Sequence, residues 1–147
     1  MHASELVEEY PLVGIDTDAL EATQTMAKLR LPGLVVTEGE GRPYAVLPAS
    51  QVVKFVVPQY IQADPSLAAV IDEPAADRIA AQLAGKKVRD LLPTHPAELP
   101  TVAADDTVLE LAAVMARMRS PLVAVVSDDR IIGVVTASRL LSLISAS

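Results

Sequence analysis

The chain has 147 residues, a formal net charge of −7, no cysteine and a hydrophobic content of 51%. This composition supports a folded core and excludes disulfides and thiolate chemistry. The negative charge argues against nucleic acid or an anionic membrane surface as a partner. The acidic start MHASELVEEY has no leader-like regions, and no apolar run reaches about 18 residues, so we expect a cytoplasmic protein.

The first part of the chain predicts the element order β-α-β-β-α. A short extended element comes first, and Asp18 and Glu21 then hold the positions of a capping box at a helix start. A buried strand, a glycine-containing turn, a second strand and a second helix follow at 34–36, 38–42, 44–47 and 50–57.

A connector with prolines at both ends follows the second helix. Its middle, 74–83, has a helical pattern, with Pro74 suited to the first turn and Gly85 to the helix end. A small apolar group at 88–92 leads into the next unit. We therefore divide the chain into a first repeat, a connector and a second repeat, at 1–57, 58–87 and 88–147.

The second repeat shows the same element order more clearly. Thr107 and Glu110 fit a capping box, and the helix stops at Ser120-Pro121 because a residue before proline avoids the α region. The apolar stripe of this helix consists of Val108, Leu111, Ala112, Met115 and Met118. Two strands and a helix follow at 122–126, 131–135 and 137–144, and the last helix is expected to turn Leu140, Leu141 and Ile144 inward.

The two units are copies of one sequence pattern. Adding 89 to a position in 11–36 gives its partner in 100–125, so that Asp16 pairs with Asp105 and Met26 with Met115. An internal repeat of this kind decides the fold. Because units of roughly 50–60 residues are marginally stable alone, we expect the copies to support each other.

The duplicated unit resembles the CBS domain, and the pair resembles a Bateman module, as in free-standing CBS domain-containing proteins. The segments that carry this resemblance in the second repeat are 88–92, 100–102, 105–110, Met115, 121–125 and 132–136. The first repeat matches over 11–56 but is more divergent. The resemblance implies an α+β (mixed α/β) fold of two β-α-β-β-α repeats packed with pseudo-two-fold symmetry.

The resemblance also implies ligand clefts between the repeats and association into a homodimer. Many members of the family bind adenine nucleotides or related compounds, so AMP, ATP and S-adenosylmethionine are the expected ligands. The family motif is a glycine, an apolar residue, Thr or Ser, two residues and an Asp that holds the ribose. Here Thr136 is kept but Arg139 takes the Asp position, and Pro48 and Gln51 stand at the two positions in the first repeat.

These substitutions leave two interpretations open for each polar candidate. Arg139 either pairs with a ligand anion at the helix start or extends to solvent or an acidic neighbour. Thr136 is either a helix N-cap or a ligand contact. Gln51 either hydrogen-bonds a ribose or base or is a solvated amide. A carboxylate accepts from both hydroxyls of a ribose, whereas arginine only donates.

The remaining candidates for ligand binding are mostly apolar residues that would flank a base, and their alternative role is ordinary core packing. Together with two polar neighbours in the second repeat, they are Val13, Pro32, Val46, Thr101, Val102, Pro121, Leu122, Val134 and Ser138.

No pattern points to catalysis or to a metal. His2 and His95 lack ligand spacing, and no nucleophile has an evident base, so we expect neither an enzyme nor a bound metal or cofactor. The leading hypothesis is a regulatory ligand-sensing module that signals through its dimer or an unidentified protein partner. The alternative is a ligand-free dimerisation module whose seam would bury Leu20, Ala27, Val108, Leu111 and Met115.

Overall fold

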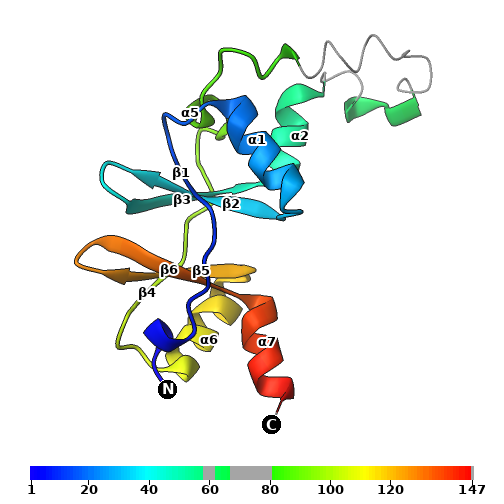
Figure 1. Ribbon diagram of the computed structural model, residues 1–147. Helices are drawn as coiled ribbons and strands as arrows, with labels where there is room; N and C mark the ends of the chain where they lie inside the picture. Colours follow the sequence, from blue (N-terminus) through cyan, green and yellow to red (C-terminus); the bar gives the residue numbers. More distant parts are fainter. Residues whose placement is uncertain (58–61, 67–80, 147) are drawn as a thin grey trace. The chain divides into compact units, whose positions relative to one another are not determined.

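A computed structural model describes residues 1–57, 62–66 and 81–146 (Figure 1). The first half of the description holds the 3-10 helix η1 (Ala3–Glu5), β1 (Leu12–Gly14), α1 (Ala19–Lys28), β2 (Gly33–Glu38), β3 (Arg42–Pro48) and α2 (Ala49–Val56). The second half holds α5 (Val88–Leu91), β4 (Thr101–Ala103), α6 (Val108–Met118), β5 (Leu122–Ser127), β6 (Arg130–Thr136) and α7 (Ala137–Ser145). The mixed α/β class and the duplicated β-α-β-β-α order are confirmed. The helix predicted over 74–83 falls largely outside the described residues, and Gly85 has the left-handed φ of +74° expected after a helix.

The described strands form two sheets of three strands, in the orders β1-β2-β3 and β4-β5-β6. In the second sheet, β4 runs parallel to β5 and β5 antiparallel to β6. Register partners alternate between the faces, so Val123 and Val135 share one face and Ala124 and Val134 the other. All four residues are buried. Burial on both faces explains why β5 is a continuous apolar run without alternation.

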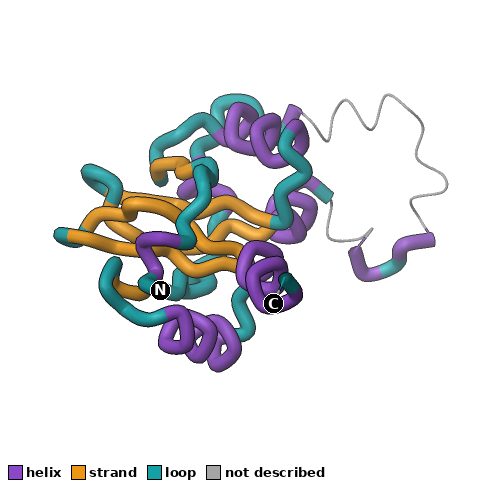
Figure 2. Tube along the Cα trace, turned by 60° about the horizontal axis from the view of Figure 1, so that its bottom comes forward, coloured by secondary structure: helices purple, strands orange, loops and turns teal. Residues whose placement is uncertain are grey.

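Helices α6 and α7 and the N-terminal helix η1 pack on this sheet, which also places the chain's first residues beside the strands (Figure 2). The core that they enclose consists of Ala3, Leu6, Val102, Leu111, Met115, Val123, Val125, Val135 and Leu140. Leu111 and Met115 are therefore core residues, and the dimer seam suggested for them from the sequence is wrong.

The inward orientation predicted for the last helix holds for Leu140 but is wrong for Leu141 and Ile144. Leu140 is 7% exposed, whereas Leu141 and Ile144 are 63% and 59% exposed. Figure 1 shows α7 leading away from the sheet, so only the start of the helix and Leu143 reach the core.

Helix starts form at the predicted caps. The Asp18 carboxylate accepts from the Glu21 amide at 3.0 Å, and the Thr107 hydroxyl accepts from the Glu110 amide at 3.2 Å. Helix α6 ends at Met118, just before Ser120-Pro121, and Arg119 closes it in a left-handed conformation with a φ of 51°.

The short segments that begin the two repeats make matching hydrogen bonds with the opposite repeat. The Ala3 and Ser4 amides donate to Asp106 O and Ala104 O at 2.8 and 3.1 Å. In the same way, the Val88 and Arg89 amides donate to Thr17 O and Ile15 O, each at 2.9 Å. Each repeat is thus completed by a segment that lies outside it in the sequence.

Because each repeat packs with the first segment of the other, the two compact units of the chain are not continuous in sequence. One comprises Met1–Leu12, Val35–Ala45 and Ala97–Ser147, and the other comprises Val13–Leu34 and Val46–Pro96. These units follow spatial contacts rather than sequence similarity, so the repeat boundaries at 57 and 87 stay predictions.

Candidate functional site

The N-terminal segment (Met1–Leu12) continues from η1 as an extended chain along β6. The Glu8 amide donates to Val134 O at 2.9 Å, and the Val134 amide donates to Glu8 O at 3.5 Å, which forms an antiparallel bridge. Gly133 makes this approach possible, because a Cβ at this position would lie 2.5 Å from the Val7 Cβ. A glycine in a strand often marks such a close backbone approach.

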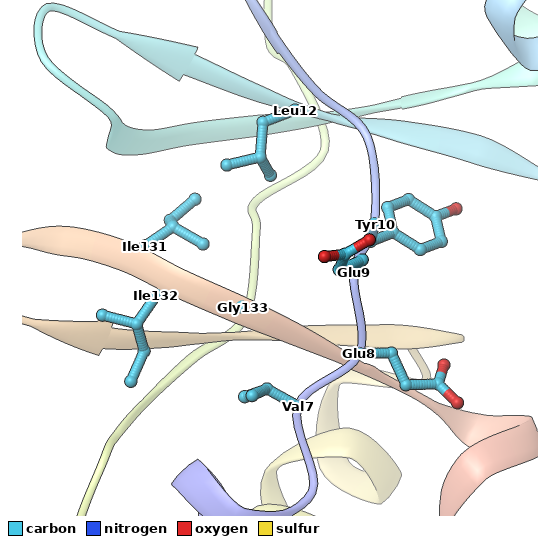
Figure 3. Close-up of a pocket in the computed structure, with 8 residues that line it drawn as sticks. All are labelled: Val7, Glu8, Glu9, Tyr10, Leu12, Ile131, Ile132 and Gly133. Atoms are coloured by element: carbon cyan, nitrogen blue, oxygen red, sulfur yellow. The ribbon is translucent and has the colours of Figure 1, made fainter.

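The segment and β6 enclose a pocket of about 280 Å³, which we name the β6 pocket (Figure 3). It is lined by Val7, Glu8, Glu9, Tyr10, Leu12, Ile131, Ile132 and Gly133. Figure 3 shows Leu12 and Ile131 pointing toward each other, so the walls include facing aliphatic side chains. Apolar walls with a few polar groups are typical of small-molecule sites, and the volume lies just below their usual range of about 300–1,000 Å³.

Glu8 and Tyr10 are polar residues of the pocket lining, and Glu8 connects the pocket to its surroundings. The Thr136 hydroxyl donates to Glu8 Oε2 at 3.4 Å and accepts from the Arg139 amide at 3.1 Å. The Glu8 carboxylate therefore lies near the start of α7, where the helix dipole favours negative charge. Burial of Tyr10 raises the pKa of its phenol, which favours the neutral hydroxyl.

The candidate residues of the second repeat gather near the start of α7. Leu122 and Thr136 are register partners, and Pro121 O accepts from the Ala137 amide at 2.8 Å. Among these candidates, the buried residues are Val102, Leu122 and Val134, and the exposed ones are Thr101, Pro121, Ser138 and Arg139. Thr136 caps α7, as one of its two interpretations predicted. Its role as a ligand contact stays a prediction.

The candidates of the first repeat lie in the other compact unit. Val13 and Val46 are buried, whereas Pro32 is exposed and its carbonyl accepts from the Ala49 amide at 2.9 Å. The Gln51 side-chain amide donates to Leu91 O at 3.1 Å, so it holds the segment that begins the second repeat. This contact is a structural role that neither interpretation of Gln51 anticipated.

None of the twelve residues proposed from the sequence lines the β6 pocket, although Thr136 contacts it through Glu8. Sequence reasoning missed the pocket because its inner wall is the N-terminal segment. A signal was present: Ala-Ser-Glu-Leu at 3–6 resembles Val-Arg-Asp-Leu at 88–91. The match extends to structure, since Glu5 and Asp90 accept from the His2 and Lys87 amides at 2.6 and 2.9 Å.

Two further observations concern alternative classes of protein. Across 1–57, 62–66 and 81–146, no group of three His, Cys, Asp or Glu residues could hold a metal ion. Among the same residues, no helix is long and apolar enough to cross a membrane.

Comparison with known proteins identifies the family. The CBS domain model matches residues 88–146. A solved CBS domain-containing protein from Kribbella flavida DSM 17836 shares 60% identity, with a TM-score of 0.93 and coverage of 99% of both chains. The chain therefore belongs to the CBS domain-containing proteins, as its resemblance predicted.

More distant structures share the fold. CBSX2, solved in complex with AMP, is 15% identical with a TM-score of 0.67, over 99% of this chain and 96% of its own. The CBS domain pair of protein MJ0100, solved with 5′-methylthioadenosine and S-adenosylmethionine, is 16% identical with a TM-score of 0.65, over 99% and 97%. No protein of curated function matches significantly.

Proposed function

We propose that the protein is a regulatory module that binds an adenosyl compound in the β6 pocket. The observation that carries this proposal is the pocket itself, which the N-terminal segment and β6 enclose next to the Thr136 motif. The solved structures of similar fold that contain AMP, 5′-methylthioadenosine and S-adenosylmethionine support this ligand class. A non-catalytic role and a cytoplasmic location belong to the same proposal.

The residues offer a specific way to hold such a ligand. The facing side chains of Leu12 and Ile131 would flank an adenine ring, which needs apolar walls. The Glu9 carboxylate lies on the same side of the N-terminal segment as Leu12 and Ile131 (Figure 3), and a carboxylate can accept hydrogen bonds from both hydroxyls of a ribose. Glu9 would thereby supply the acceptor that Arg139 and Gln51 do not provide at the family's motif positions.

Binding would act on the N-terminal segment, which forms one wall of the pocket. A ligand shifts an equilibrium only by its differential affinity for two states. Because the ligand would contact both the segment and β6, it would favour the docked arrangement of the segment. A second copy or a partner protein that contacts this segment would then respond to whether the ligand is bound.

Calorimetric titration with AMP, ATP and S-adenosylmethionine tests the proposal. We expect heat, a rise in the melting temperature and amide chemical-shift changes centred on Glu8, Glu9 and Gly133. A Gly133→Val variant should lose binding, because its side chain would overlap Val7 and the pocket. Absence of heat, thermal shift and amide changes with all three compounds at about 1 mM, an energy of about −4.1 kcal/mol, would sink the proposal.

A second candidate function is self-association, and exposed apolar side chains on the helices favour it. Leu109 is 79% exposed, and Leu141 and Ile144 are more than half exposed. In the other compact unit, α1 and α2 border an apolar groove of about 280 Å³, lined by Thr23, Met26, Ala27, Arg30, Leu31, Ala49, Val52 and Val53. A homodimer would remove such surfaces from water.

Light scattering across a concentration series measures this association directly. We expect a dimer mass for the natural chain and a shift toward monomer for Leu141→Glu. Ser142→Glu is the matched control on the same helix. A mass of about 15.5 kDa at every concentration contradicts the dimer.

A further inference from the structure

We propose that the β6 pocket selects a positively charged adenosyl compound, of the sulfonium class, over adenine nucleotides that carry phosphate. This inference rests on the proposed function and narrows its ligand class. It depends on the charges that line the pocket rather than on its size, because both classes share the adenosine part.

The charged groups in the pocket lining all have one sign. Glu8 and Glu9 contribute carboxylates, and the lining contains no lysine, arginine or histidine. A cation in the pocket would be attracted by both carboxylates, whereas a phosphate would be repelled by both. Each carboxylate is exposed, so each contribution is moderate and sensitive to salt.

The two carboxylates lie on opposite sides of the N-terminal segment, and Glu9 is the one on the side of Leu12 and Ile131. Figure 3 shows Val7 and Glu9 on one side of this extended chain and Glu8 and Tyr10 on the other. A cation between Leu12 and Ile131 therefore faces the Glu9 carboxylate, and the Glu8 carboxylate attracts it from across the segment.

The arginines near the pocket do not reverse this charge. Arg130 precedes the lining residue Ile131, but its guanidinium pairs with the Glu40 carboxylate at 2.6 Å. Arg139 is exposed and lies outside the lining, and only its amide contributes to the cap with Thr136. Neither guanidinium belongs to the pocket lining.

S-adenosylmethionine and S-adenosylhomocysteine form a sharp pair of probes. They share the adenosine and amino acid parts and differ in one methyl group and the positive charge on sulfur. We expect S-adenosylmethionine to bind roughly fivefold more tightly than S-adenosylhomocysteine, with AMP the weakest of the three. Raising the salt from about 0.05 M to about 0.5 M should reduce this ratio, since the Debye length falls.

Variants that remove one carboxylate charge show which residue causes the preference for the cation. Glu8→Gln should reduce the preference for S-adenosylmethionine by roughly two- to fivefold while leaving affinity for S-adenosylhomocysteine nearly unchanged. Glu9→Gln should reduce the same preference and also weaken the binding of both compounds, because Glu9 is the proposed ribose acceptor. The control is Glu98→Gln, an exposed residue of the same compact unit that does not line the pocket. It should retain the preference of the natural chain. Equal melting temperatures for the three variants show that they fold.

The outcomes separate this inference from the proposed function. If AMP binds as tightly as S-adenosylmethionine, or if neither variant changes the preference, the charge selection is overturned while adenosyl binding stands. If no adenosyl compound binds, benzyltrimethylammonium and benzoate test the charge alone. Binding of the cation that weakens in Glu9→Gln then supports the charge selection, and binding of neither probe overturns both proposals.

Discussion

Gly133 determines how closely the N-terminal segment approaches β6. A methyl group at this position would lie 2.5 Å from the Val7 Cβ and 2.9 Å from its Cγ1, well inside van der Waals contact. The segment would have to move away from the strand to relieve the overlap. The absence of a side chain at Gly133 therefore allows the N-terminal segment to form the inner wall of the β6 pocket.

We predict that Gly133→Ala lowers the free energy of unfolding by about 1–3 kcal/mol, the usual cost of overpacking. Urea denaturation measures this loss. Val7→Gly should restore part of it in the double variant, because Val7 provides the colliding atoms. A loss below about 0.5 kcal/mol, typical of a neutral surface change, would show that the segment does not pack here as described.

Single residues show both what the sequence can predict and where it stops. The capping roles of Asp18 and Thr107 followed from local residue types at fixed spacing. The contact between Gln51 and Leu91 joins residues 40 positions apart, and the contact between Glu8 and Thr136 joins residues 128 apart. No local pattern specifies such pairs, so the polar part of the candidate site could not be predicted.

At the scale of elements, the start of α7 differs from the start of α2. Thr136 caps α7 with its hydroxyl, whereas Pro48 at the start of α2 makes no side-chain cap hydrogen bond. The same hydroxyl also donates to Glu8. Loss of this hydroxyl therefore affects both the helix and the N-terminal segment.

We predict that Thr136→Ala destabilises the protein by about 0.5–2 kcal/mol, the range for loss of an N-cap. Thr136→Ser keeps the hydroxyl and should stay close to the natural stability. Thermal unfolding followed by circular dichroism compares the two variants. If both lose the same stability, the Thr136 methyl group rather than its hydroxyl is responsible.

The predicted elements agree with the structure where the apolar pattern of a single element is enough to show which of its residues are buried. The continuous apolar runs gave the positions of β2 and β5, and the helical stripe gave α6. The inward face of α7 was predicted wrongly for Leu141 and Ile144, because periodicity alone does not show which side of the helix meets the sheet. Ala137, Leu140 and Leu143 pack in or against the core, and Leu141 and Ile144 are left exposed.

At the scale of the whole molecule, sequence similarity and spatial compactness divide the chain differently. The similarity between 11–36 and 100–125 identified two copies of one unit. It did not show that η1 packs on β4 and β6 of the second copy, or that α5 packs on α1 and α2 of the first. A short segment exchanged between copies contributes few residues to an alignment, although its side chains complete a core.

This exchange makes the N-terminal segment part of the second repeat's stability. Leu6 is 1% exposed and belongs to the core cluster that contains Leu111 and Val123. We predict that Leu6→Ala lowers the free energy of unfolding by about 2–5 kcal/mol, as for other buried leucines. Leu109→Ala is the matched control, because Leu109 is largely exposed in α6, and it should cost less than about 0.5 kcal/mol.

Hydrogen exchange read together with urea denaturation gives the more specific test. If η1 belongs to the core of the second repeat, Leu6→Ala must increase exchange at the amides of β5 and β6 along with that of Leu6. A variant that loses protection only in residues 1–7 would mean that the segment docks on a finished core rather than completing it. In that case ligand-induced docking of the segment could still close the β6 pocket, but it would not stabilise the sheet behind it.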